Sequence, residues 1–291
     1  MKIGTYIQSF RLRTLPLSMS GIILGCGLAA EQVPVGTHFW VVFTLAIMTT
    51  LSLQILSNLS NELGDAVRGT DDGQTARVAY GLQAGSITYG EMRGLITAFV
   101  CFAVISGTAL VWAAFGTLFN WLSIVFLLLG LSAIIGAMTY TLGKHNYGYK
   151  GWGDLGVFVF FGLLSTMGSF YLQAQTLTVD VCLSAVAIAL PIVGVLNLNN
   201  IRDMDNDLKH GKRTFASLLG KKGGKMYHTV LISGCMILFA SIGHYWALLV
   251  TPVLIWHLYY IFTNEGDRLD LQMPVLMFTT IITAGLACIP C

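Results

Sequence analysis

Long apolar runs separated by short polar segments dominate this chain and constrain its fold more than any other feature. A helix needs about 20 mostly apolar residues to cross the hydrocarbon core of a bilayer. The runs are continuous rather than alternating, which disfavours a transmembrane β-barrel. We therefore predict an all-α polytopic membrane protein with nine transmembrane helices, formed by a single domain over residues 1–291. The nine candidate spans fall at about 15–30, 39–60, 94–113, 119–141, 154–173, 179–200, 226–246, 247–263 and 273–290.

The overall composition excludes several other classes of protein. Hydrophobic residues make up 55% of the chain and charged residues 10%, whereas about 25% of the residues of a soluble domain are charged. A soluble enzyme, a disordered chain and a nucleic-acid-binding domain are thereby excluded. The six cysteines are scattered through apolar runs without metal-type spacing, and we interpret them as small hydrophobic residues.

Charged residues lie on one side of the predicted spans. All 16 Lys and Arg residues fall before the first span or in the loops that follow the even-numbered spans. The acidic residues follow the same division, except for Glu31 and Asp180. Because Lys and Arg are retained on the cytoplasmic side, we predict a multi-pass protein of the cytoplasmic (inner) membrane. The N-terminus and the loops that carry the chemically competent side chains would then be cytoplasmic.

Two of the apolar runs end in segments rich in Asn and Asp. The run at 39–60 continues into NELGDAVRGTD, and the run at 179–200 continues into NNIRDMDNDLKHGKRT. In each segment an Asn is followed four residues later by an Asp, and residues at this spacing share one face of a helix. Gly64 and Gly69 favour an end to the first helix, which would let Asp71 turn back toward it. The predicted metal ligands are Asn61, Asp65 and Asp71 in the first motif and Asn199, Asp203 and Asp207 in the second.

The chemistry of these side chains indicates a site for a metal–diphosphate group. Carboxylate and amide oxygens suit Mg²⁺, which proteins hold through one or two carboxylates together with substrate phosphates. Basic side chains interleaved with the acids would contact the phosphates. The alternative is an ordinary pair of solvated loops, but an ionisable group within a membrane costs about 2.5–3.5 kcal/mol and marks function by default. The predicted diphosphate ligands are Arg68, Arg77, Lys144, Arg202, Lys209 and Lys212.

These two segments resemble the Asp-rich motifs of the UbiA superfamily of intramembrane prenyltransferases, with the D-x-x-x-D pattern at Asp203 and Asp207. The GTD and GKRT sequences that end the motifs, and FRLRTLPLSMSGIILG near the N-terminus, are similar to the menaquinone branch. The resemblance covers essentially the whole chain. It implies a helix bundle around a central cavity, capped by cytoplasmic loops at 61–92 and 201–225. It also implies Mg²⁺-dependent transfer of a polyprenyl chain from polyprenyl diphosphate to 1,4-dihydroxy-2-naphthoate, with decarboxylation, giving demethylmenaquinone. No obligate protein partner is implied.

A third segment follows the run at 119–141. Its Tyr140-x-x-x-Lys144 pattern resembles the family's Tyr/Lys motif. The resemblance implies that Lys144 contacts the diphosphate, that Tyr140 lies near the bond that breaks, and that both act with Asp65 in catalysis. Each side chain also has a plainer interpretation, since tyrosines and lysines are common at the membrane surface. We interpret His228, His244 and His257 as isolated residues without a role.

Two further functions remain open from the sequence. Another branch of the family would act on 4-hydroxybenzoate, homogentisate or a tetrapyrrole, and the motifs alone do not expose the acceptor pocket. A secondary transporter also places Asp and Asn on interrupted helices. Its acids would lie near the bilayer midplane, whereas here they gather at one mouth of the bundle.

Overall fold

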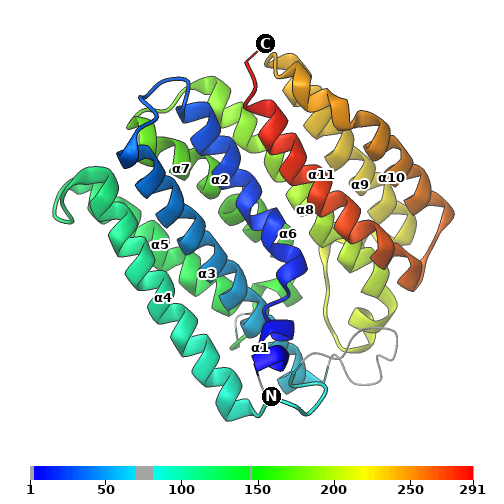
Figure 1. Cartoon of the computed structure of the whole chain (residues 1–291). Coiled ribbons are helices and arrows are strands. Elements are labelled where there is room, and N and C mark those ends of the chain that lie inside the picture. Colours follow the sequence, from blue (N-terminus) through cyan, green and yellow to red (C-terminus); the bar gives the residue numbers. More distant parts are fainter. Residues whose placement is uncertain (1–2, 70–80, 145, 291) are drawn as a thin grey trace.

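The computed structural model describes residues 3–69, 81–144 and 146–290. In these ranges the chain is almost wholly helical, and its β-type pairing is a single parallel bridge between Lys150 and Arg213. The long helices run side by side, and the two termini lie at opposite ends of the bundle (Figure 1). The predicted all-α membrane fold is therefore confirmed.

The helices follow one another without intervening sheet. The first part of the chain forms α1 Ile3–Ser9, the 3-10 helix η1 Leu12–Thr14, α2 Leu15–Ala29, α3 Thr37–Arg68, α4 Tyr89–Phe115 and α5 Trp121–Thr139. The middle forms the 3-10 helix η2 Tyr147–Tyr149, α6 Gly153–Val157, the π-helix η3 Phe158–Leu164, α7 Ser165–Ala174 and α8 Val179–Lys209. The last part forms α9 Phe215–Ser241, the 3-10 helix η4 Tyr245–Val250, α10 Thr251–Thr263, the 3-10 helix η5 Gly266–Leu271 and α11 Gln272–Ala287.

Eight helical stretches in the described ranges are long and apolar enough to cross a membrane. They correspond to eight of the nine predicted spans. The ninth, predicted at 226–246, corresponds to α9, which packs along α8. Three lysines in the first half of α9 lower its mean hydropathy, and a backbone kink at Gly220 (φ 71°) separates its first turns from the remainder.

Helices α3 and α8 run well beyond the spans predicted for them. Helix α3 continues to Arg68 and α8 continues to Lys209, so both Asn/Asp motifs are helical up to those residues. Helix α3 ends at Gly69, whose left-handed conformation (φ 68°) suits a glycine. The prediction that 61–92 and 201–225 are loops is wrong for the residues that belong to α3, α4, α8 and α9. Residues 70–80 lie outside the described ranges.

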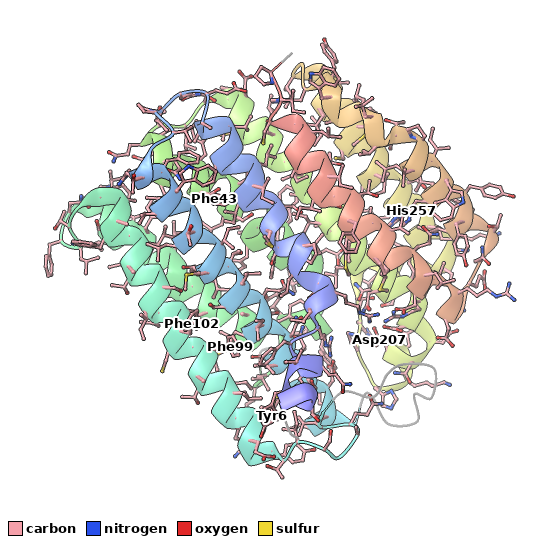
Figure 2. The ribbon with its side chains drawn as sticks, in the orientation of Figure 1. Tyr6, Phe43, Phe99, Phe102, Asp207 and His257 are labelled. Atoms are coloured by element: carbon pink, nitrogen blue, oxygen red, sulfur yellow. The ribbon has the colours of Figure 1, made fainter. Side chains whose placement is uncertain are left out.

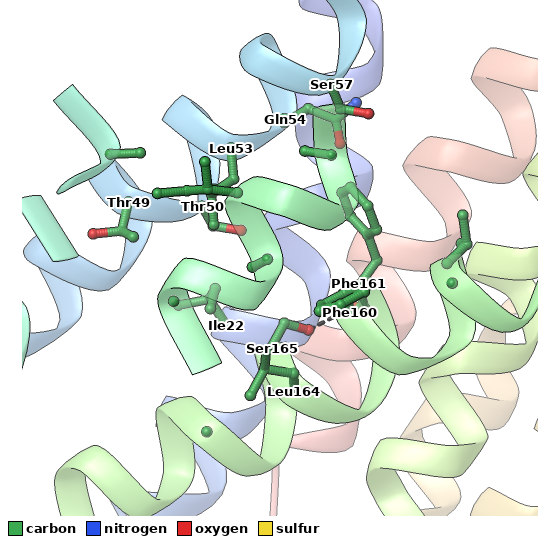
Figure 3. Close-up of a pocket in the computed structure, with 18 of the residues that line it drawn as sticks. Ile22, Thr49, Thr50, Leu53, Gln54, Ser57, Phe160, Phe161, Leu164 and Ser165 are labelled. Atoms are coloured by element: carbon green, nitrogen blue, oxygen red, sulfur yellow. Dashed lines mark hydrogen bonds between the residues drawn. The ribbon is translucent and has the colours of Figure 1, made fainter. Parts of the chain in front are cut away.

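Helix α8 is the most deeply buried of the candidate spans and organises the bundle. It packs against α2, α9, α11 and η3, while α3 packs against α4 and α5 as a second group (Figure 1). Between the two groups lies a cavity of about 480 Å³. Figure 3 shows Thr50, Leu53 and Gln54 of α3 together with Phe161 and Leu164 of η3 around this cavity. The predicted central cavity is therefore present, with mainly apolar walls.

Candidate active site

The site predicted from the two motifs lies where α3 and α8 end, at the end of the bundle that also holds the N-terminus. Figure 2 shows Asp207 at the same end as Tyr6 of α1. Asn61 of the first motif, Asn199 of the second and Tyr140 all line the cavity. The structure thus brings residues from three separate segments of the sequence to one mouth of the cavity.

In the second motif, Arg202 gathers the predicted ligands around its guanidinium group. Its Nε and Nη2 atoms donate to the two carboxylate oxygens of Asp203, each at 2.9 Å. The Nη2 atom also donates to Oδ1 of Asn199 at 2.7 Å. An amide oxygen and a carboxylate oxygen therefore converge on one cationic nitrogen, as the four-residue spacing predicts. The remaining nitrogen, Nη1, contacts Asp270 and the sulfur of Met273.

The two motifs meet around Lys212, in the turn between α8 and α9. The Nζ atom of Lys212 lies 3.0 Å from Oδ2 of Asp207. Burial alone would lower the pKa of Lys212, but the negative charges of Asp207 and Asp65 together raise it above its ordinary value. Lys212 therefore stays charged, under the influence of one carboxylate from each motif.

Tyr149 completes this meeting point from the segment that follows α5. Its hydroxyl donates a hydrogen bond to Oδ1 of Asp65 at 2.6 Å. Its ring lies under two cations, with Cζ of Arg68 at 4.9 Å and Nζ of Lys212 at 5.7 Å from the ring centroid. The backbone carbonyl of Tyr149 accepts a hydrogen bond from the amide of Arg213. Sequence reasoning missed Tyr149, because nothing in its own segment marks it as a partner of Asp65.

Arg68 fixes the segment after α5 against the first motif. Its guanidinium donates to the backbone carbonyls of Thr141 and Gly143. The Thr141 hydroxyl in turn donates to the carbonyl of Ser60 and lies 3.2 Å from Oδ1 of Asn61. This close approach requires a glycine at Gly64, since a Cβ atom there would lie 2.7 Å from Cβ of Thr141. Arg68 is therefore engaged with the backbone in this structure, and its predicted contact with diphosphate stays a prediction.

The Tyr/Lys segment has one residue in the cavity and one outside it. The ring of Tyr140 is half-buried, lines the cavity and makes an edge contact with Tyr147, with ring centroids 5.3 Å apart. The Tyr147 hydroxyl is held by the carbonyl of Gly136. Lys144 and Lys209 are exposed and form no ion pair with any described residue. The predicted diphosphate contacts of these two lysines stay predictions.

The mouth carries oxygen donors of the kind that Mg²⁺ prefers. No group of three or more His, Cys, Asp or Glu side chains in the described ranges lies close enough to hold a metal ion. Instead, the oxygens of Asn199 and Asp203 converge on Arg202, and Lys212 pairs with Asp207. The binding of Mg²⁺ by these residues stays a prediction. The predicted ligand Asp71 and the predicted phosphate contact Arg77 lie outside the described residues.

The prediction that the histidines are isolated is wrong for His228 and His257. A fully buried row of hydrogen-bonding side chains joins α8, α9, α10 and α11. It consists of Asn197, His228, His257 and Gln272. The Nε2 atoms of the two histidines are 3.0 Å apart. Nδ1 of His257 lies 2.8 Å from Oε1 of Gln272, and Nδ1 of His228 lies 3.3 Å from Nδ2 of Asn197. His257 is drawn within this half of the bundle in Figure 2.

Comparison with known proteins gives consistent results along the chain. Residues 18–282 match the model of the UbiA prenyltransferase family. The chain is 43% identical to 1,4-dihydroxy-2-naphthoate octaprenyltransferase of Escherichia coli (strain K12). The 258 aligned residues cover 86% of this chain and 82% of that protein. It is 35% identical to the protein of the same name from Haemophilus influenzae, over 91% of this chain and 87% of the relative.

Solved structures share the fold. A UbiA homolog from Aeropyrum pernix K1 superposes with a TM-score of 0.70 over 94% of this chain and 96% of that one, at 18% identity. A UbiA homolog from Archaeoglobus fulgidus bound to DMAPP and Mg²⁺ gives a TM-score of 0.63 over 98% and 99% of the two chains, at 17% identity. The matched sequence model, the similar relatives and the helical bundle agree, and the chain belongs to the UbiA prenyltransferase family of multi-pass membrane enzymes.

Proposed function

We propose that this protein transfers a polyprenyl chain from polyprenyl diphosphate to 1,4-dihydroxy-2-naphthoate and releases the prenylated, decarboxylated quinol, which is the reduced form of demethylmenaquinone. The observation that carries the proposal is the cavity of about 480 Å³, whose walls are mainly apolar and whose mouth holds both Asn/Asp motifs. An apolar cavity suits a prenyl chain, and the polar mouth suits its charged headgroup. The acceptor is proposed from the similarity to relatives named 1,4-dihydroxy-2-naphthoate octaprenyltransferase.

The two motifs would hold the donor headgroup through Mg²⁺. Asn61 and Asp65 from α3, and Asn199, Asp203 and Asp207 from α8, supply the oxygen ligands, with Asp71 as a further predicted ligand. When bound, Mg²⁺ offsets the negative charge that develops on the departing diphosphate. Lys212 and Arg202 are already at the mouth, so both can pair with phosphate oxygens once the carboxylates bind the metal.

The chemical step would be an alkylation of the electron-rich ring. The bond between C1 of the prenyl group and its oxygen breaks, and its electron pair leaves with the diphosphate. The acceptor ring donates an electron pair to C1, forming the new carbon–carbon bond. The bond from the ring to its carboxylate then breaks, carbon dioxide leaves, and the electron pair restores the aromatic ring. Tyr140 faces the cavity and would stabilise the allylic cation through its ring.

The apolar walls would protect that cation from water. Phe160 and Phe161 of η3 line the cavity opposite residues of α3 (Figure 3). A π-helix is rare and is often found at functional sites. We therefore place the reacting carbon between this wall and Tyr140, on the apolar side of the two motifs.

The site would face the cytoplasm of the inner membrane. The helix ends that carry the described Lys and Arg residues lie at the end of the bundle that holds the N-terminus (Figure 1). Cysteines introduced at 31–38, 114–118 and 174–179 should react with impermeant reagents from the opposite side to cysteines introduced at 209–213. Reaction of both sets from one side would contradict this orientation.

One assay tests the proposed function directly. Purified protein is incubated with Mg²⁺, a polyprenyl diphosphate and a panel of aromatic acceptors, and products are identified by mass spectrometry. We expect prenylated, decarboxylated product from 1,4-dihydroxy-2-naphthoate, and none from Asp203→Asn. The matched control is Asp205→Asn on the same helix, because Asp205 is exposed and pairs with Lys221. Product only from 4-hydroxybenzoate, homogentisate or a tetrapyrrole would reassign the branch, and solute uptake by proteoliposomes without a covalent product would indicate a transporter.

A further inference from the structure

Asp270 joins three segments of the chain at the mouth of the cavity. It belongs to η5, just before α11, and its side chain is 42% exposed. One carboxylate oxygen accepts from Nη1 of Arg202 on α8, and the other lies 3.4 Å from Nη1 of Arg13 near the N-terminus. Neither the two motifs nor the Tyr/Lys segment includes this residue.

The partner of Asp270 is the arginine that holds the second motif. The Arg202 side chain is only 3% exposed, and its other two nitrogens donate to Asp203 and Asn199. The guanidinium therefore lies between two carboxylates, Asp203 on one side and Asp270 on the other. Because a guanidinium is planar and its donors are fixed, the contact with Asp270 determines how the remaining donors meet Asp203.

The charges at this point balance in pairs. Arg13 and Arg202 carry two positive charges, and Asp203 and Asp270 carry two negative charges. A metal ion that binds at Asp203 and Asn199 meets the positive charge of Arg202 at close range. The negative charge of Asp270 offsets that repulsion. Removal of the Asp270 charge would leave Asp203 as the carboxylate that pairs with Arg202 beside the metal ligands.

We propose that Asp270 is a positioning residue that orients Arg202 and tunes the balance between metal and diphosphate at the second motif. The inference rests on the proposed function, in which Asp203 and Asn199 contribute to a Mg²⁺–diphosphate site. Asp270 restrains Arg202 so that Asp203 keeps its negative character toward the metal. It also competes with phosphate oxygens for Arg13 and Arg202, so it weakens the binding of diphosphate that carries no metal.

These two effects have opposite signs, and a merely structural role would not produce that pattern. Loss of the Asp270 charge should weaken metal binding and strengthen binding of metal-free diphosphate. Local disorder would instead weaken both. For one unit charge at this range, partly screened by water, the expected change is about tenfold in each dissociation constant.

The test uses the full-length protein in detergent, with two binding measurements on each variant. Mn²⁺ binding is followed by electron paramagnetic resonance, and binding of inorganic pyrophosphate is followed by calorimetry in the presence of EDTA. For Asp270→Asn we expect about tenfold weaker Mn²⁺ binding and tighter pyrophosphate binding. Asp270→Glu, which keeps the charge, should restore both values toward those of the wild type. The matched control is Asp267→Asn, since Asp267 is exposed on the same 3-10 helix.

A double-mutant cycle identifies the route of the effect. Because Asp270 acts on the metal partly through Arg202, Asp270→Asn should change Mn²⁺ binding less in an Arg202→Gln background than in the wild-type background. Equal effects in both backgrounds, or Mn²⁺ and pyrophosphate affinities that change in the same direction, would overturn the inference. Failure of the proposed function has a different signature. In that case Asp203→Asn would bind Mn²⁺ as the wild type does, and both proposals would be overturned. If Asp203→Asn loses Mn²⁺ binding but Asp270→Asn binds Mn²⁺ as the wild type does, only the proposal for Asp270 is overturned.

Discussion

The Tyr149 hydroxyl donates a 2.6 Å hydrogen bond to Oδ1 of Asp65, so the segment after α5 fixes a carboxylate at the end of α3. Tyr149→Phe removes this donor and leaves the ring between Arg68 and Lys212. We expect a loss of about tenfold or more in kcat, because Asp65 would no longer be held in one orientation. The melting temperature should fall only slightly, since one partly exposed hydrogen bond contributes about 1 kcal/mol. Unchanged turnover would show that this contact does not position Asp65 for the reaction.

The carboxylates of the two motifs should be essential to activity but not to assembly. Asp65→Ala, Asp203→Ala and Asp207→Ala should each abolish product formation while the protein still inserts and purifies, because each carboxylate contacts polar side chains near the mouth rather than the apolar core. EDTA should have the same effect, and added Mg²⁺ should reverse it. Full turnover by Asp203→Ala, or activity in metal-free buffer, would contradict the assignment.

Lys212 gives a prediction about alkaline pH. Asp207 and Asp65 raise its pKa in the folded protein above the ordinary value of 10.5. A raised pKa means that the charged form stabilises the fold fully below about pH 10, and that this contribution is lost as the pH rises through the folded-state pKa. The difference in melting temperature between the wild type and Lys212→Met should therefore be constant from pH 7 to 9 and shrink above pH 10.5. A difference that disappears below pH 9 would contradict the pairing.

Substitutions at Tyr140 and Lys144 should distinguish stabilisation of the allylic cation from neutralisation of the diphosphate charge. Tyr140→Phe keeps the ring that lines the cavity. It should retain much of the rate if the π face acts on the cation, and should lose about 10²-fold if the hydroxyl acts on the leaving oxygen or the acceptor. Lys144→Ala should weaken donor binding and ionisation together. The measurements are KM and kcat for the donor. Normal turnover with strongly weakened diphosphate binding in Tyr140→Phe would contradict both roles for Tyr140.

The buried histidine chain should contribute to stability rather than to chemistry. Gln272→Leu removes the acceptor of His257 and leaves a buried ring nitrogen without its partner. The cost is about 1–3 kcal/mol of unfolding free energy. Thermal unfolding in detergent should show a clear decrease in melting temperature. The control is Thr263→Val, because Thr263 is exposed at the end of α10 and bonds only locally.

The membrane helices were predictable because hydrophobic runs are a local signal that the bilayer enforces. The helix ends were not, because the last turns of α8 contact residues outside that helix, such as Asp270 and Lys212, which its own sequence pattern does not reveal. The four-residue spacing did predict that Asn199 and Asp203 share a face. Tyr149 and Asp270 could not be found in this way, since they are separated from their partners by 84 and 68 residues. Pairing across such separations depends on packing that no local pattern records.

The π-helix Phe158–Leu164 is a part of the cavity wall where the polypeptide could gain or lose one residue. A π turn contains an extra residue compared with an α turn. Deletion of one residue there would convert it to α-helix and rotate the residues before it relative to those after it. Helix α7 could keep its close packing against α2, while different side chains of α6 and η3 would turn toward the cavity. A single-residue insertion or deletion at this one turn would thus remodel the pocket without dismantling the bundle, which makes it a natural place for acceptor preference to diverge.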